Sequence, residues 1–237
     1  MLRIPVVLIL VLLISATVAG RAEDWPQFRG PGGQGQAVGS AWPLRWSEQE
    51  NIAWKVPISG RGWSSPVVSD QQIWLTTALD TAATVDVTRR TLERKGKDVP
   101  SPQVASHLTL KAICVDRASG RVLHDVTLFE IDEPEVISSS NSFASPTPVI
   151  DRGRVFCEFG ALGTACVDAA TGTVIWSRRL VVDHQVGPGS SPVVYGNLLI
   201  LVRDGIDQQY VTALDQASGQ TVWRTDRPPL APTLPTL

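Results

Sequence analysis

Apolar residues in this chain fall into short runs that tight polar turns separate, from about residue 51 to residue 226. Val, Ile, Thr and aromatic residues dominate runs such as LKAICV, QYVTAL and TVIWSRRL. These residue types prefer the half-buried, pleated surface of a sheet. The pattern therefore predicts an all-β fold.

One short segment occurs three times along the chain. The copies are VDRASGRVLH (Val115–His124), VDAATGTVIW (Val167–Trp176) and LDQASGQTVW (Leu214–Trp223). In each copy an Asp is followed by a Gly and then by a closing ring. An Asp that opens a tight turn can bond its own backbone two residues on, and Gly supplies the positive φ. We therefore predict hairpin turns at Asp116–Gly120, Asp168–Gly172 and Asp215–Gly219.

A second motif alternates with the first and consists of Ser-Pro, a strand, a tight polar turn and another strand. Its copies begin near Ser64, Ala144 and Ser190. The two alternating motifs together contain four strands. Pro146 and Pro192 lie 46 residues apart, so this four-stranded unit is about 46 residues long. Four-stranded units of this period are typical of β-propeller blades. We predict an incomplete β-propeller of four-stranded antiparallel blades, with about three full blades plus one N-terminal strand.

The closing rings are expected to have a structural role. Trp176 and Trp223 end or flank the last strand of a blade, and Trp54 in NIAWKVPI fits the same position on the N-terminal strand. A large ring there fills the gap between adjacent blades. His124 replaces Trp in one copy, and we expect it to pack in the same way.

The first 22 residues are predicted to be a secretory signal peptide. Arg3 precedes an apolar run that ends in small residues around Ala19–Ala22, which is the layout of such a signal. The apolar run is short for a bilayer span, and an uncleaved anchor is the alternative. We expect an exported protein, in the periplasm or outside the cell, with no membrane attachment after cleavage.

The rest of the chain divides by composition into three parts. Residues 23–50 form an N-terminal extended segment, 51–226 the partial propeller, and 227–237 a Pro-rich tail or a truncated next blade. The glycine-rich GPGGQG stretch (Gly30–Gly35) follows no predicted strand and opens no helix, so we predict a flexible loop there.

The net charge limits the kinds of partner that the chain is expected to bind. A formal net charge of −2 argues against a nucleic-acid surface.

Cys114 and Cys166 both stand two residues before a turn Asp, where the third copy has Ala213, so they are predicted to be small buried strand residues. A cross-strand disulfide between Cys157 and Cys166 is the alternative, although directly paired strands seldom supply the required geometry.

Long loops are predicted on only one face of the propeller. The turns that join the first two and the last two strands of each blade are tight, and the other connections vary in length. Because loops carry function more often than strands do, we place the candidate binding residues on this loop face. They are Asn141, Asp183, His184, Gln185, Arg203, Asp204 and Asp207.

The first of these loops carries the basic segment RRTLERKGK (Arg89–Lys97). We predict a short helix there and interpret the segment as a solvent-exposed part of the loop with no binding role. Contact with an acidic partner or envelope polymer is the alternative, and such binding would be salt-sensitive.

The alternation of D-x-x-[ST]-G-x-x-x-W turns with S-P-V-V strands resembles the PQQ-type (pyrroloquinoline-quinone) propeller repeat. The opening DWPQFRGP (Asp24–Pro31) resembles the mature start of secreted bacterial proteins of that group. The resemblance implies two functional classes, quinoprotein alcohol dehydrogenases and non-catalytic propellers such as the lipoprotein of outer-membrane assembly. The dehydrogenases carry adjacent cysteines and a Ca²⁺ site of carboxylate and amide oxygens, and neither is identified in this sequence. The Cys that the lipoprotein carries for lipid attachment is also absent.

The resemblance therefore favours a secreted, non-catalytic propeller that acts as an interaction scaffold in the cell envelope. Its expected partners are a protein or an envelope polymer, and no cofactor or metal is expected. A fragment or degenerate relative of a quinone-dependent alcohol dehydrogenase, with PQQ and calcium, is the alternative.

Overall fold

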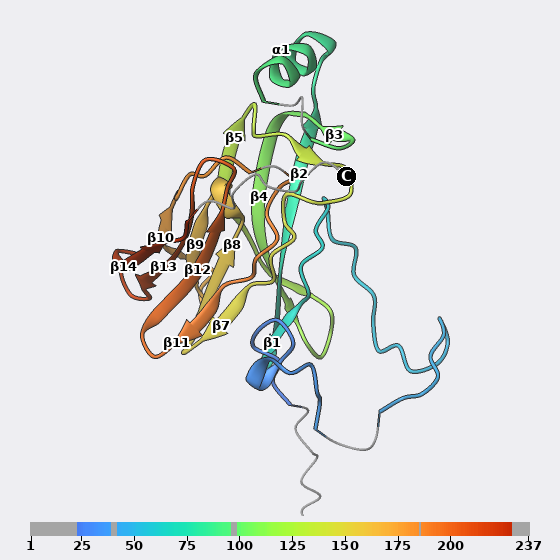
Figure 1. The fold of residues 1–237 in the computed structure, drawn as a ribbon. Coiled ribbons are helices and arrows are strands. Elements are labelled where there is room, and N and C mark those ends of the chain that lie inside the picture. Colours follow the sequence, from blue (N-terminus) through green and yellow to red (C-terminus); the bar gives the residue numbers. More distant parts are fainter. Residues whose placement is uncertain (1–22, 39–41, 96–98, 185, 229–237) are drawn as a thin grey trace, which may run out of the picture.

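The computed structural model describes residues 23–38, 42–95, 99–184 and 186–228. In these ranges the chain forms three four-stranded sheets and one two-stranded sheet, all antiparallel. Figure 1 shows the larger sheets standing against one another, each as one blade. This confirms the predicted all-β, incomplete propeller.

Each blade follows the order of the chain from one edge of its sheet to the other. The first blade contains β1 (Val67–Ser69), β2 (Gln72–Ala82), β4 (Ala105–Asp116) and β5 (Val122–Asp132). The second contains β7 (Val149–Asp151), β8 (Arg154–Glu158), β9 (Thr164–Asp168) and β10 (Val174–Arg178). The third contains β11 (Val193–Tyr195), β12 (Leu198–Asp204), β13 (Gln209–Asp215) and β14 (Thr221–Asp226).

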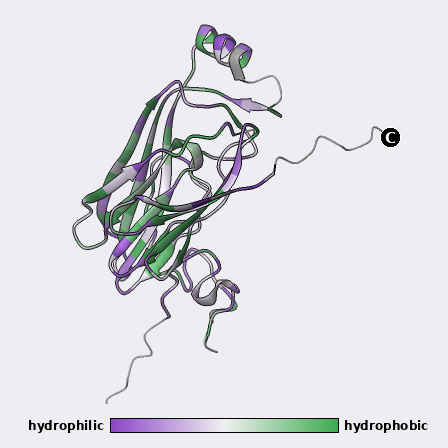
Figure 2. Ribbon diagram, turned by 60° about the vertical axis from the view of Figure 1, so that its left-hand side comes forward, coloured by the Kyte–Doolittle hydropathy of each residue, from purple (hydrophilic) through white to green (hydrophobic). Residues whose placement is uncertain are grey.

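The hydrophobic core lies between the blades, because side chains alternate across each strand. In β8, Val155 and Cys157 belong to the cluster shared with the first blade, whereas Phe156 between them joins the cluster shared with the third. Strand β9 is almost fully buried for the same reason, and β14 is exposed along its whole length. Figure 2 shows hydrophobic residues running along the stacked strands. The middle blade is thus covered on both faces.

The three Asp–Gly turns have one geometry. The Gly120 N–H donates to the carbonyl of Asp116 at 2.9 Å, and the Ser119 N–H donates to the Asp116 carboxylate at 2.8 Å. Gly120 has a φ of 74°, a conformation that a side chain disfavours. The turns at Asp168 and Asp215 repeat these bonds.

These turns predict an acid-dependent loss of stability. Hydrogen bonds from Ser119, Thr171 and Ser218 lower the pKa of the Asp carboxylate in each turn. A lowered folded-state pKa stabilises the fold above the ordinary Asp pKa of about 3.9, and the contribution is lost as the pH falls toward the folded value. Replacing Asp116, Asp168 and Asp215 together with Asn should flatten the decline between about pH 5 and about pH 3. Urea unfolding of both proteins across that range measures the effect, and equal slopes would contradict it.

The closing rings lie on the turns of the following blade. The Trp54 Nε1–H donates to the carbonyl of Arg117, and the Trp176 Nε1–H donates to that of Gln216, both at 2.9 Å. A Cβ on Gly120 would stand 2.6 Å from the Trp54 ring, and one on Gly219 would stand 2.7 Å from the Trp176 ring. Glycine is therefore required at these turns both for its φ and for the approach of the ring.

Where His124 replaces Trp, strand β2 of the same blade completes the contact. His124 lies against Gly172 and stacks on Trp74 with ring centroids 5.7 Å apart. The carbonyl of Ala169, which corresponds to those of Arg117 and Gln216, accepts from Gln72 Nε2 at 2.8 Å. His124 and Gln72 together therefore supply the ring and the donor that a single Trp supplies elsewhere.

Trp54 and Trp223, the first and the last of the closing Trp residues, differ from Trp176. The residues around Trp54 are not paired into a strand, although the ring occupies the position expected of a blade's last strand. The predicted N-terminal strand is wrong in this detail, because none of the described residues forms a sheet beside it. Trp223 remains 37% exposed on β14.

The long first loop folds partly into a helix, α1 (Val85–Lys95). The Thr84 hydroxyl caps it by accepting from the Val87 N–H at 3.4 Å. After the helix, β3 (Pro102–Gln103) pairs with β6 (Ile137–Ser138). Figure 1 shows α1 projecting beyond the ends of β2 and β4. The predicted helix is confirmed up to residue 95, and residues 96–98 lie outside the described ranges.

Residues 24–35 run across the first two blades. Trp25 forms a two-way backbone bridge with Val68, and the carbonyl of Pro26 accepts from the Ile150 N–H. The chain then turns at Gln27–Gly30 into the 3₁₀ helix η1 (Pro31–Gly33). The glycine-rich stretch predicted to be flexible is therefore a hydrogen-bonded turn, in which Gly30 lies against the Trp25 ring.

No helix in the described part of the chain has the length and apolar character needed to cross a bilayer. Residues 1–22, which carry the predicted signal peptide, lie outside the described ranges.

Candidate functional site

Loops of the second and third blades line a pocket of about 190 Å³ on the predicted loop face. Its lining brings together three of the predicted residues, His184, Arg203 and Asp204, from the loop before β11 and the end of β12. Glu158, at the end of β8, lines the same pocket and was not predicted from the sequence.

A buried ion pair lies beneath this pocket. Arg203 Nη1 lies 3.0 Å from Glu158 Oε1, and Arg203 Nη2 donates to Glu158 Oε2 at 3.2 Å. The Thr164 hydroxyl and the Gly160 N–H also donate to the Glu158 carboxylate, each at 2.6 Å. The side chains are 2% and 1% exposed. Burial raises the pKa of Glu158, and the Arg203 charge opposes the rise. The pair therefore links the second blade to the third.

His184 also makes an internal contact. Its Nε2 is 2.7 Å from the Ala161 N–H and accepts from it, which places the proton of the neutral ring on Nδ1. Burial lowers the pKa of His184, and Arg203 adds to this, while Glu135 opposes it. The ring is therefore neutral at pH 7, and Nε2 holds the loop that follows β8.

The remaining predicted residues hold loops around the pocket. Asn141 Nδ2 donates to the carbonyls of Val186 and Pro188, at 3.0 and 3.1 Å. Asp207 accepts from the Asp183 N–H at 2.8 Å. Asp204 pairs with Arg227. Gln185 lies outside the described residues.

The contacts of Glu158 do not fit the role of a calcium ligand in a quinone–calcium centre. Ca²⁺ takes six or more oxygen ligands, but the Glu158 carboxylate already accepts from Arg203, Thr164 and Gly160. Among the described residues, no three His, Cys, Asp or Glu side chains are grouped as metal ligands would be. The Glu158 carboxylate is therefore not free to serve as a calcium ligand.

All three cysteines are free and buried in strands. Cys166 pairs in register with Phe156, and Cys157 with Ala165, so the alternative of a Cys157–Cys166 disulfide is wrong. The 3₁₀ helix η2 (Gly160–Leu162) sets this register between β8 and β9.

The cysteines are predicted to resist thiol reagents. Burial raises the pKa of Cys114 and of Cys166 to about 12, and raises that of Cys157 as well. A thiol of raised pKa provides little thiolate, which is the reactive form. We expect no reaction with Ellman's reagent in the native protein at pH 8 and reaction of all three thiols in guanidinium chloride. A rapidly reacting thiol in the native protein would contradict this.

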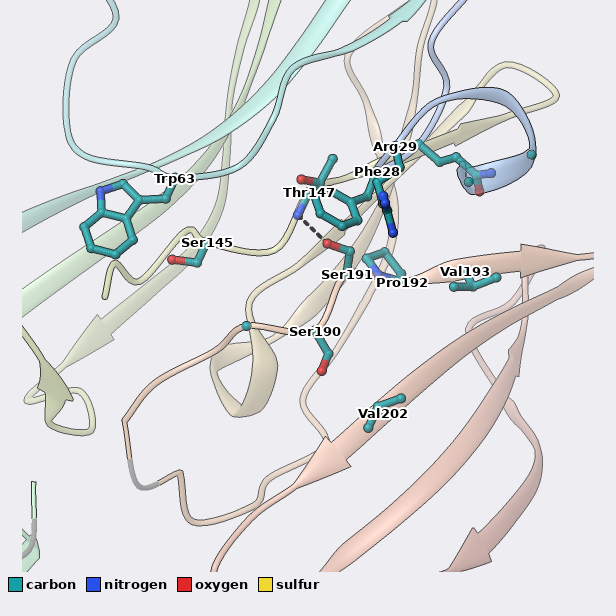
Figure 3. A pocket seen from close by; sticks show the side chains of 14 residues that line it. Phe28, Arg29, Trp63, Ser145, Thr147, Ser190, Ser191, Pro192, Val193 and Val202 are labelled. Atoms are coloured by element: carbon teal, nitrogen blue, oxygen red, sulfur yellow. Dashed lines mark hydrogen bonds between the residues drawn. The ribbon is translucent and has the colours of Figure 1, made fainter. Parts of the chain in front are cut away.

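A second, larger cleft of about 650 Å³ opens where the first strands of the blades meet the N-terminal turn. Figure 3 shows Trp63 on one side, Phe28 and Arg29 on another, and Pro192 and Val193 at the start of β11. Trp63 and Phe28 are 54% and 52% exposed. The cleft is larger than the pocket around Arg203, and exposed aromatic side chains rather than a buried ion pair line it.

Hydroxyls of the Ser-Pro motifs join the blades beside this cleft. The Ser65 N–H donates to Thr147 Oγ1, and the Thr147 N–H donates to Ser191 Oγ, both at 3.0 Å. Figure 3 includes the second of these bonds. The Pro of this motif marked the repeat in the sequence, but the role of the hydroxyl before it was not predicted. Recurrence of Ser or Thr at the same position was the available signal.

Comparison with known families agrees with this architecture. The model of the PQQ-type repeat family described as outer membrane protein assembly factor BamB matches residues 109–236, more than half of the chain. The chain belongs to this PQQ-like repeat family. The match begins within β4 and spans the second and third blades. No curated protein matches the chain.

Solved structures similar to this PQQ-like repeat chain include a dehydrogenase and a BamB. A europium-containing methanol dehydrogenase matches with a TM-score of 0.45 and 14% identity, over 74% of this chain and 27% of its own. BamB from Moraxella catarrhalis matches with a TM-score of 0.36 and 13% identity, over 73% of this chain and 51% of its own. The chain thus spans about a quarter of the dehydrogenase and half of the BamB structure.

Proposed function

We propose that this PQQ-like repeat protein is a non-catalytic scaffold that binds partner proteins in the cell envelope. The observation that carries the proposal is the use of the loop-face side chains. Glu158, Arg203, His184 and Asn141 each bond to the protein's own blades or loops. Groups engaged in this way position surfaces, whereas a general acid or base must reach a substrate.

The N-terminal segment supplies a surface suited to protein contact. Leu44 and Trp46 are 91% and 68% exposed and follow one another closely in the chain. Exposed apolar groups gathered in one place are typical of interaction sites. The match to the BamB family model is compatible with a protein partner, and the predicted signal peptide places the encounter outside the cytoplasm.

The scaffold role is tested with the full chain expressed with an affinity tag in its natural host. Chemical cross-linking in intact cells should capture a defined envelope protein. The double variant Leu44→Ser/Trp46→Ser should lose that protein. Val85→Ser is the matched control, because Val85 is 84% exposed on α1 and lies elsewhere on the surface. Equal capture by both variants, or no specific partner, would contradict the scaffold role.

The dehydrogenase alternative has a direct test. Addition of PQQ, Ca²⁺ and a range of primary alcohols to the purified chain should give no reduction of an artificial electron-accepting dye. Dye reduction that requires both quinone and alcohol would favour the alternative.

A further inference from the structure

The first strands of the three blades have equivalent free edges. Val68, Ile150 and Val194 are the middle residues of β1, β7 and β11 and pair with Ile73, Val155 and Leu199. Each lies one pair before a two-residue turn. In an antiparallel hairpin, alternate pairs turn their N–H and C=O groups away from the partner strand. These three residues therefore present their backbone groups outward, at the edge of each sheet.

The N-terminal segment occupies two of these edges. Val68 exchanges two backbone hydrogen bonds of 2.8 Å with Trp25, and the Ile150 N–H donates to the carbonyl of Pro26 at 2.8 Å. The segment then turns away, because the Gly30 N–H bonds back to Gln27. No described segment pairs with the outward side of Val194. Among the described residues, the third edge is therefore left unpaired where the first two are filled by an extended chain.

The larger cleft adjoins this open edge. Val193, next to Val194, lines it and is 51% exposed. Phe28 and Trp63 supply aromatic surface, and Arg29 is the one charged residue among the described residues that line the cleft. An exposed strand edge with adjacent side-chain pockets is the arrangement by which proteins bind extended peptides.

We propose that the edge of β11 and the cleft beside it bind an extended peptide segment of a partner protein. The peptide pairs with Val194 through its main chain and places apolar side chains against Phe28 and Trp63. An acidic residue of the peptide faces Arg29. This proposal rests on the proposed scaffold function and names the site and the peptide chemistry that the scaffold uses.

The hydroxyls near the cleft favour a peptide over a saccharide. Thr147 and Ser191 accept hydrogen bonds from neighbouring blades, so part of their capacity is already used. The groups at the open edge are one backbone donor and one backbone acceptor, which match the main chain of a strand. A saccharide in the cleft would leave this pair of groups unused.

The test compares Val194→Pro with Val194→Ala. Proline removes the outward N–H at this edge, and alanine keeps it. Both variants shorten the same half-buried side chain, so their difference reports the N–H. The probe is a fluorescein-labelled peptide DWPQF, which has the sequence of Asp24–Phe28, the segment that pairs with the first two edges. Fluorescence anisotropy should show binding by wild type and Val194→Ala, and a loss of roughly tenfold or more for Val194→Pro.

A second measurement needs no variant. Hydrogen exchange of the wild-type chain should show new protection of the Val194 amide when DWPQF is added. Absence of both binding and protection at about 1 mM peptide, a concentration that detects weak complexes, would overturn the proposal. Binding of maltohexaose that Val194→Pro leaves unchanged would also overturn it and assign the cleft to glycans.

The outcome separates this site from the broader function. If the cross-linked envelope partner is retained by Val194→Pro but lost by Leu44→Ser/Trp46→Ser, the scaffold role stands and the β11 site falls. If DWPQF binds at Val194 but no envelope partner is captured, the peptide site stands and the scaffold role falls.

Discussion

Replacing Arg203 with alanine should lower the free energy of unfolding by about 3–5 kcal/mol. The substitution leaves the Glu158 carboxylate buried without its cation, and the Thr164 hydroxyl and Gly160 N–H offset only part of that cost. Because the pair joins β8 to β12, the loss should separate the third blade from the second. Urea unfolding followed by tryptophan fluorescence measures it.

Two controls distinguish burial from charge. Arg90→Ala removes a surface pair with Glu133, in which both side chains are at least 40% exposed, and should cost less than about 1 kcal/mol. The double variant Arg203→Met/Glu158→Leu should recover most of the loss, because apolar replacement of a buried pair is often neutral. An Arg203→Ala protein as stable as Arg90→Ala would contradict the prediction.

Trp176→Ala should be the second most damaging change, at about 3–5 kcal/mol. The indole fills the space over the Gly219 turn, packs near Phe156 with ring centroids 6.1 Å apart, and donates to the carbonyl of Gln216. Its removal creates a cavity at the blade interface and leaves that carbonyl without its donor. Differential scanning calorimetry should record a lower melting temperature.

Trp223→Ala is the matched comparison, because this Trp has the same position in its own blade. No turn of a following blade covers it among the described residues, and it is 37% exposed. Its replacement should cost less than about 1 kcal/mol, as is usual for residues at the surface. Equal losses for both variants would mean that the rings stabilise their own blades rather than the next one.

The repeat could be predicted from the sequence because its information is local. The Asp–Gly turns and the strands beside them depend on residues a few positions apart, and their spacing fixes the blade. The ring positions of Trp54 and Trp176 followed from the same register. The absence of a paired strand at Trp54 did not, because strand formation needs a partner that the local sequence does not specify.

The candidate site was less predictable, because its contacts join distant blades. Arg203 and Glu158 are far apart in the chain, and only the stacking of β8 on β12 shows that they neutralise each other. A Glu within the apolar strand VFCEF could have indicated a buried partner. The replacement of one Trp by His124 together with Gln72 could not be predicted from the sequence either, because Gln72 has no unusual feature in its own strand.

Apart from Trp223, each closing ring contacts the Asp–Gly turn of the blade that follows it in the sequence. Trp54 lies on the first blade, His124 on the second and Trp176 on the third. When a blade leaves the ribosome, the Asp–Gly turn that its closing ring will contact therefore has not yet been synthesised. Assembly should lag one unit behind translation, with each new turn locking the unit before it.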